Sequence, residues 1–149
     1  MKIFIICSKA FYGKIAPVRD WLQEHGFEVL LPHTFSHPEA EGEWYAESEQ
    51  KHAEMKGLMF LKSRETISGV DAVLTLNFDK NGQKNYIGGS TFLELYEAFM
   101  QGKKIYLWNN IPEGMLKDEI AGFSPVIING DLEKVLGDSG EEGRRVVEK

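Results

Sequence analysis

The stretch SGVDAVLTLNFDKNGQKNYIGGSTFLELYEAFMQGKKIYLW, residues 68–108, decides the fold. It contains an apolar run at 70–78, a turn-rich segment at 79–89, an amphipathic segment that ends at Gly102, and a second apolar run at 103–108. Neither apolar run alternates as a half-exposed strand does, which indicates strands buried on both faces. A strand, a helix and another such strand predict a parallel βαβ unit.

The flanking sequence extends this alternation in both directions. Residues 2–7 and 27–32 predict two further buried strands, and apolar residues with helical spacing lie between them at 14–25. Residues 125–129 predict a fifth strand. The pattern indicates an α/β fold: a doubly wound, parallel five-stranded sheet with helices on both faces, either Rossmann-like or flavodoxin-like.

The remaining segments connect these elements. Residues 8–13 and 33–47 show no period and are expected to be loops, the second unusually long. A helix is expected from about Glu47 to Ser68, and shorter helices at 115–121 and 131–137.

Length, composition and charge limit the class of protein. The chain has 149 residues, 42% of them hydrophobic, which predicts one domain at 1–137 and a polar C-terminal tail at 138–149 that frays. A net charge of -6 argues against nucleic acid and anionic membranes as partners, although a small anion can bind a local basic site. No apolar stretch is long enough to span a membrane. Cys7 is the single cysteine, which favours a reducing cytoplasm.

The loops after the strands form the candidate binding edge, because ligands of such sheets bind outside the carboxyl ends of the strands. These loops are 7–13, 32–44, 77–90 and 108–114. The third carries two adjacent glycines before a helix, where free amides and the helix dipole favour a phosphate or a sugar hydroxyl. Substrate-binding candidates are Ser8, Lys9, Asn77, Tyr86, Gly88, Gly89 and Ser90.

Glu94 has two interpretations that the pattern leaves open. The segment from Thr91 to Glu94 matches a capping box, in which the glutamate reaches back to the amide of the cap residue. The spacing of Phe92, Leu95 and Phe99 marks the core face of the helix, and Glu94 lies off that face, where it can be a nucleophile.

Residues 68–108 resemble the core of the nucleoside 2-deoxyribosyltransferase-like superfamily, which includes deoxynucleoside monophosphate N-glycosidases. The matching features are an apolar strand headed by Asp71, the glycine-rich Gly88–Ser90, the Glu94–Leu95 dipeptide and the segment Gly102–Ile105 before an apolar strand.

The resemblance implies roles for individual residues. Glu94 would attack the anomeric carbon of a 2'-deoxynucleoside or its monophosphate, and Asp71 would help to position the substrate. Ser8, Gly89 and Ser90 would hold the sugar or the phosphate. For Asp71, a residue that only caps a turn at the start of a strand is the alternative.

The function expected is cleavage or transfer of an N-glycosidic bond through a covalent deoxyribosyl–glutamate ester. The departing base needs a proton, and Asp79, Tyr86 and Glu97 are the candidate donors. No cofactor is expected, and the histidines and Cys7 lack the spacing of a metal site. The resemblance also implies a homo-oligomer. The alternative function is a non-catalytic nucleotide-binding or sensing module on the same scaffold.

Overall fold

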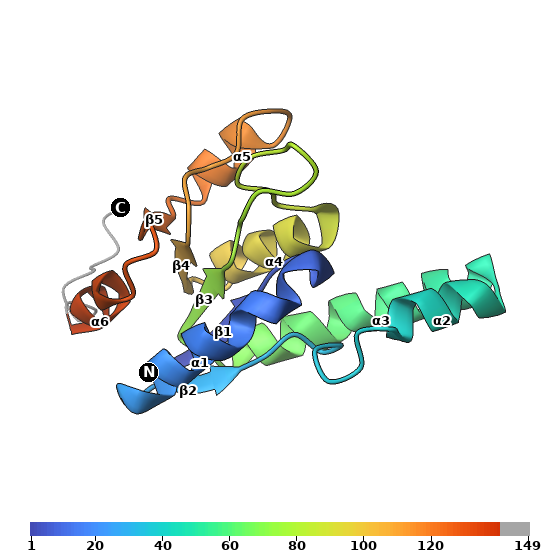
Figure 1. The fold of residues 1–149 in the computed structure, drawn as a ribbon, viewed down its shortest axis with the longest axis horizontal. Helices are drawn as coiled ribbons and strands as arrows, with labels where there is room; N and C mark the ends of the chain where they lie inside the picture. The colour runs from blue at the N-terminus through green and yellow to red at the C-terminus, as the bar shows by residue number, and fades with distance from the viewer. Residues whose placement is uncertain (141–149) are drawn as a thin grey trace.

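The computed structural model describes residues 1–140, and its strands form one parallel sheet. The strands are β1 (Lys2–Ile6), β2 (Glu28–Leu30), β3 (Ala72–Thr75), β4 (Lys104–Leu107) and β5 (Val126–Ile127). Their order across the sheet is β2-β1-β3-β4-β5 (Figure 1). The doubly wound α/β prediction is confirmed, and the order is the flavodoxin-like one of the two alternatives.

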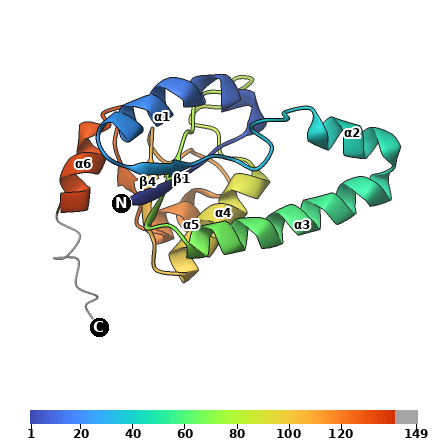
Figure 2. The same ribbon diagram turned by 90° about the horizontal axis from the view of Figure 1, so that it is seen from below.

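Helices cover both faces of this sheet (Figure 2). On one face lie α1 (Ile15–Glu24) and α6 (Glu133–Gly140). On the other lie α3 (Glu49–Ser68), α4 (Gly89–Met100) and α5 (Lys117–Gly122). Each face therefore has its own apolar core.

Strand β1 shows why its sequence does not alternate. Ile3 and Ile5 belong to the core under α1, whereas Phe4 and Ile6 belong to the core under α3 and α4. All four side chains are at most 1% exposed. A central strand covered on both sides must be apolar at every position.

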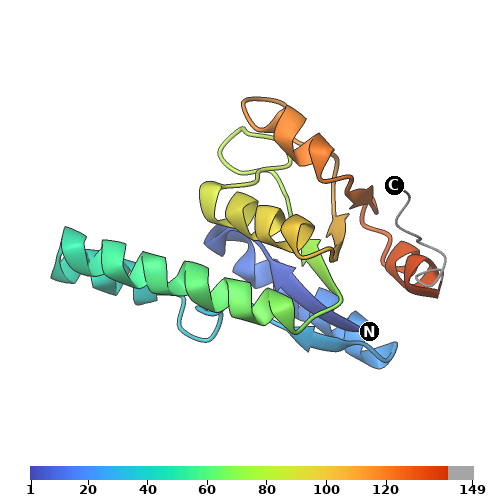
Figure 3. The same ribbon diagram turned by 180° about the vertical axis from the view of Figure 1, so that it is seen from behind.

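Two helices project from the body of the molecule (Figures 1 and 3). Helix α2 (Ala40–Glu47) runs beside the outer part of α3, and we call residues 40–60 the arm. The prediction of a loop throughout 33–47 is therefore wrong over its second half. Ala40 is the only buried residue of α2, so the helix has no apolar stripe that a periodicity could reveal.

The segment after β1 also differs from its prediction. Residues Lys9–Lys14 form the short 3-10 helix η1 instead of a loop. The hydroxyl of Ser8 caps η1 by accepting a hydrogen bond from the amide of Ala10, at 3.3 Å. This cap fixes the direction of the chain where it leaves the sheet.

Helix α4 is rotated relative to the predicted core face. Phe99, predicted to be buried, is 46% exposed. Its ring contacts the ring of Phe123 at the edge of the helix, with 5.5 Å between the centroids, and Phe92 does the same at 5.7 Å. The side chains that α4 buries are Thr91, Leu95 and Ala98.

The predicted tail at 138–149 lies outside the described residues from 141 onward. Residues 138–140 continue α6. Asp138 accepts a hydrogen bond from the Lys104 ammonium at 2.9 Å and another from the Tyr106 hydroxyl at 2.7 Å, which ties α6 to β4. Within residues 1–140, no helix combines the length and the apolar character that crossing a membrane requires.

Candidate functional site

A cavity of about 310 Å³ lies at the carboxyl ends of β1 and β3. In the order β2-β1-β3, the chain leaves β1 toward one side of the sheet and leaves β3 toward the other, so their loops diverge and leave room for a ligand. The walls come from η1, the loop after β2, the arm and the start of α4. The cavity therefore lies at the edge that the strand pattern predicts.

Most of the predicted site residues meet in this cavity. They come from the loop after β1, the loop after β3 and the first turns of α4, which are far apart in the sequence. The predicted residues that line it are Ser8, Lys9, Tyr86, Gly88, Gly89, Ser90 and Glu94.

The Glu94 carboxyl group does not cap its own helix. Helix α4 begins at Gly89 with Gly88 as its N-cap residue, three residues before Thr91, the N-cap residue that the capping box requires, so Glu94 lies in the second turn. Its Oε2 instead accepts a hydrogen bond of 2.8 Å from the hydroxyl of Ser63 on α3. The capping interpretation is wrong, and Glu94 faces the cavity.

The environment of Glu94 makes it a weak acid for a carboxyl group. Burial raises the pKa of Glu94 to about 7, because the charged form of this partly buried carboxyl group has less contact with water. The hydrogen bond from Ser63 and the positive charge of Lys56 act in the opposite direction but do not cancel the burial. A carboxyl group in this state changes its charge near neutral pH, which is typical of catalytic groups.

The glycine-rich turn brings backbone close to Tyr86. A Cβ atom on Gly88 would lie 3.0 Å from the Tyr86 hydroxyl oxygen, closer than a normal contact. Gly88, Gly89 and Ser90 all line the cavity, so the amide end of α4 and its positive dipole lie at the cavity wall. This end of the cavity suits an anion.

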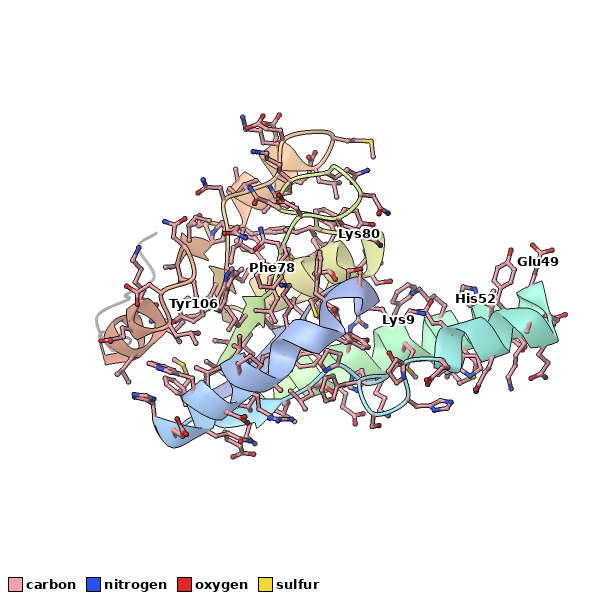
Figure 4. The ribbon with its side chains drawn as sticks, in the orientation of Figure 1. Lys9, Glu49, His52, Phe78, Lys80 and Tyr106 are labelled. Atoms are coloured by element: carbon pink, nitrogen blue, oxygen red, sulfur yellow. The ribbon has the colours of Figure 1, made fainter. Side chains whose placement is uncertain are left out.

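Lysines add positive charge at the same end. The Lys80 ammonium lies 3.4 Å from the Ser8 hydroxyl oxygen and 4.6 Å from the centroid of the Tyr86 ring. Lys9 also lines the cavity. Figure 4 shows Lys9 and Lys80 on the side of the body that faces the arm, where His52 is located.

Asp71 is not brought to the cavity. It precedes β3, at the amino ends of the strands, and its carboxylate accepts a hydrogen bond of 2.8 Å from the backbone amide of Lys2. The predicted catalytic role therefore lacks the required placement. The alternative, a carboxylate that caps backbone at a strand start, describes what Asp71 does.

Asn77 is also outside the cavity, because it is completely buried. Its amide nitrogen donates to the carbonyls of Asn109 and Asn110 at 3.1 and 3.0 Å, and its amide oxygen accepts from the amide of Asn109 at 2.9 Å. Asn77 thus ties the loops after β3 and β4 together and does not line the cavity.

Two of the three candidate proton donors lie elsewhere. Asp79 accepts a hydrogen bond from the amide of Asn85 at 3.0 Å, and Glu97 pairs with Arg64 at 2.9 Å. Neither lines the cavity, whereas Tyr86 does.

Several residues of the arm and of α3 were not predicted as site residues. Glu41, Lys56 and Ser63 all line the cavity. One signal was present for Ser63: it lies one helical turn before the buried Ile67, so a small polar residue occupies the inward face of α3. The arm was predicted as a loop at 33–47 followed by a helix from about Glu47, and neither prediction marked Glu41 or Lys56 as a site residue.

Tyr12, His33 and Thr34 line another wall and were also missed. The hydroxyls of Tyr12 and Thr34 are hydrogen-bonded at 2.7 Å. Burial and the charge of Lys62 lower the pKa of His33, so its ring is mostly neutral at pH 7. Within residues 1–140, no group of three or more potential metal-binding side chains comes together.

The sequence matches no protein-family model and no curated protein. The structure is similar to that of the CMP N-glycosidase BcmB from Clostridium botulinum, with 16% identity, a TM-score of 0.47, and coverage of 91% of this chain and 98% of that chain. It is also similar to the flavoenzyme NAD(P)H:(acceptor) oxidoreductase FerB from Paracoccus denitrificans, with 17% identity, a TM-score of 0.45, and coverage of 85% and 74%.

Proposed function

We propose that this protein cleaves or transfers the N-glycosidic bond of a 2'-deoxynucleoside or deoxynucleoside monophosphate through Glu94. The observation that supports this most is the placement of the Glu94 carboxyl group. It lines a cavity at the ligand-binding edge of the sheet, and its own helix does not use it as a cap.

The proposed reaction has two steps. A carboxylate oxygen of Glu94 forms a bond to the anomeric carbon while the bond from that carbon to the base breaks. The electron pair leaves with the base nitrogen, which gains a proton. Water, in a hydrolase, or a second base, in a transferase, then attacks the same carbon and frees the carboxylate. A deoxysugar suits this path, because it has no 2-hydroxyl to crowd the attack.

Tyr86 is the proton donor that we propose. Of the three candidates from the sequence it is the one that lines the cavity. The Lys80 ammonium lies 4.6 Å from the centroid of its ring, so a cation lies beside the proposed donor. Tyr86→Phe removes the proton and keeps the ring, and we expect it to slow base release more than it weakens substrate binding.

A monophosphate substrate is supported by the cationic end of the cavity. Ser8, Lys9, Lys80 and the amide end of α4 combine hydroxyl, ammonium and backbone donors, the groups that bind phosphate in proteins. We expect Lys80→Gln to raise KM for a deoxynucleoside monophosphate more than for the corresponding deoxynucleoside.

Product analysis tests the proposal directly. The protein is incubated with deoxynucleosides and their monophosphates, with and without a second base, and free or exchanged base is separated by chromatography. Glu94→Gln is expected to abolish the activity. Glu97→Gln is the matched control, because Glu97 is on the same helix but pairs with Arg64 outside the cavity. No base release from any substrate, or full activity in Glu94→Gln, would contradict the proposal.

A non-catalytic nucleotide-binding or sensing module is the second candidate. It is supported by the absence of Asp71, Asp79 and Glu97 from the cavity lining, so that none of the predicted partner carboxylates accompanies Glu94. Thermal stabilisation by a nucleotide without any product would select this function.

A homo-oligomer is supported by apolar side chains on the outer faces of α3 and α4. Leu61 is 61% exposed and Met100 60% exposed, and Leu58 and Tyr96 are about half exposed. Exposed apolar side chains on two neighbouring helices favour association with another chain. Light scattering is expected to give a multiple of 16.9 kDa, and Leu61→Asp is expected to lower it. A monomer at high protein concentration would contradict the proposed homo-oligomer.

We also propose a cytoplasmic location and a small-molecule partner. Burial raises the pKa of the single cysteine, Cys7, to about 12, which keeps its thiol protonated and unreactive. The negative net charge supports a nucleotide-sized ligand over nucleic acid. Cell fractionation tests the cytoplasmic location, and a filter-binding assay with DNA tests the preference for a small molecule over nucleic acid.

A further inference from the structure

We propose that Lys56, held in the cavity by Glu41, is a positioning residue whose ammonium raises the ionised fraction of the Glu94 carboxyl group, the form that attacks. This role rests on the function proposed above. It assigns a task to the arm, which the cleavage reaction as described does not use.

Helix α3 presents two groups to Glu94 from the same side. Lys56 and Ser63 are seven residues apart, which is close to two helical turns, so both side chains project from one face. Ser63 donates its hydrogen bond of 2.8 Å to Oε2 of Glu94. Lys56 lines the same cavity nearer the tip of the arm, and its charge opposes the effect of burial on Glu94.

Lys56 does not move freely, because Glu41 holds it. The Lys56 ammonium lies 3.1 Å from Oε1 of Glu41, and Nε2 of His52 lies 3.2 Å from the same oxygen. The three side chains are between 26% and 34% exposed, so solvent screens their interactions less than those of a surface pair.

Glu41 is an anion in this arrangement. Desolvation acts to raise the pKa of Glu41, but the hydrogen bonds from Lys56 and His52 outweigh it and leave the pKa below its ordinary value. Glu41 therefore remains charged at neutral pH and holds the Lys56 ammonium at the wall of the cavity. Helix α2 supplies this anion, which gives the arm a place in the site.

The other titratable groups around Glu94 do not replace Lys56. Burial raises the pKa values of Cys7 and Tyr12, so both are neutral at pH 7, and His33 is mostly neutral for the reason given above. Lys9 and Lys80 lie at the end of the cavity that we propose binds phosphate, where their ammonium groups would pair with a substrate phosphate. The remaining titratable group of the cavity lining is Tyr86. Arg64 and Glu97 share a second pocket with Glu94, and they pair with each other at 2.9 Å.

Two substitutions separate an electrostatic role from a structural one. Lys56→Met and Glu41→Gln break the same ion pair, so a merely structural role predicts the same effect from both. An electrostatic role predicts different effects, because the first removes a cation from the cavity and the second removes an anion. Lys51→Met is the matched control, because Lys51 is also on α3 but does not line the cavity.

The experiment follows the Glu94 carboxyl carbon by NMR as a function of pH, in protein labelled with ¹³C in the glutamate carboxyl groups. The resonance is assigned by its loss in Glu94→Gln. Lys56→Met is expected to raise the measured pKa of Glu94 by about one pH unit, as loss of a nearby opposite charge does. Glu41→Gln is expected to raise that pKa clearly less than Lys56→Met does, because Lys56 loses its anchor but keeps its charge, and Lys51→Met is expected to leave the pKa unchanged.

An unchanged pKa in Lys56→Met, or upward shifts of equal size in Lys56→Met and Glu41→Gln, would overturn the proposal. The titration needs no substrate, so it is independent of the activity assay. If the wild-type protein releases no base, the proposed reaction fails while the titration still measures the effect of Lys56. If the protein is active, the acid limb of kcat/KM is expected to move with the measured pKa.

Discussion

Replacing Ser63 with alanine removes the hydrogen bond of 2.8 Å that Glu94 accepts. A hydrogen bond to a charged group contributes about 1.5–3 kcal/mol, and one pKa unit corresponds to about 1.4 kcal/mol. The bond stabilises the ionised carboxylate, so its loss favours the protonated form. We therefore expect the pKa of Glu94 to rise from about 7 to roughly 8 or higher.

The attacking group is the ionised carboxylate, so the change has a definite sign. At pH 7 the ionised fraction is about one half in the wild type and about one tenth or less in Ser63→Ala. The expected kcat/KM for base release is at least about fivefold lower at pH 7, and the difference between the two proteins becomes smaller toward pH 9.

The assay is kcat/KM for the best deoxynucleoside monophosphate, measured from about pH 5.5 to about pH 9, the range in which the Glu94 charge changes. Ser68→Ala is the matched control, because Ser68 is on the same helix, is exposed, and donates to the carbonyl of Arg64 outside the cavity. The reasoning is refuted if Ser63→Ala is slower by one constant factor at every pH. It is also refuted if Ser68→Ala shows the same altered pH profile as Ser63→Ala.

The other predictions concern stability and the glycine-rich turn. Burial raises the pKa of Glu94 above its ordinary value of 4.5, so Glu94 destabilises the fold as pH rises from 4.5 through about 7. Glu94→Gln is therefore expected to be more stable than the wild type at about pH 8, by up to about 3 kcal/mol, and equally stable below pH 4.5, in urea unfolding. Asp138→Ala leaves the Lys104 side chain, 7% exposed, without its carboxylate partner, and is expected to cost about 3 kcal/mol in the same assay. Asp20→Ala breaks a more exposed pair and is expected to cost less than about 1 kcal/mol; equal losses would contradict the argument. Gly88→Ala places a Cβ 3.0 Å from the Tyr86 hydroxyl, but a φ of -86° causes no backbone strain in alanine. We therefore expect a lower kcat/KM with a nearly unchanged Tm. An unaltered kcat/KM would contradict the proposed role of Tyr86 as proton donor.

Much of the binding edge could be predicted from the sequence, because it follows from topology. Once the strands are parallel, every loop after a strand meets the others at one edge, and Ser8 and Gly88 lie on such loops. The same rule places Asp71 at the opposite edge, since it precedes its strand. The resemblance suggested a catalytic role for Asp71, but its position relative to β3 does not allow one.

The partners of Glu94 could not be predicted. Ser63 is 31 residues away in the sequence, and its hydrogen bond to Glu94 depends on how α3 packs beside α4. Glu41 is on a helix without an apolar stripe, so no periodicity marks that helix or directs it toward Lys56. Local patterns report which face of an element is buried, and they carry no information on which polar groups of two elements meet.

The sequence by itself determined the secondary structure of the sheet and its helices, because apolar runs, helical spacing and glycine stops act over a few residues. Gly26 and Gly102, with φ of +90° and +72°, end α1 and α4 as their positions in the sequence predict. Only the tertiary structure decided the state of the Glu94 carboxyl group. Its burial, its bond to Ser63 and its proximity to Lys56 arise from three helices that pack together, and desolvation and charge at that point depend on distances in space rather than on separation along the chain.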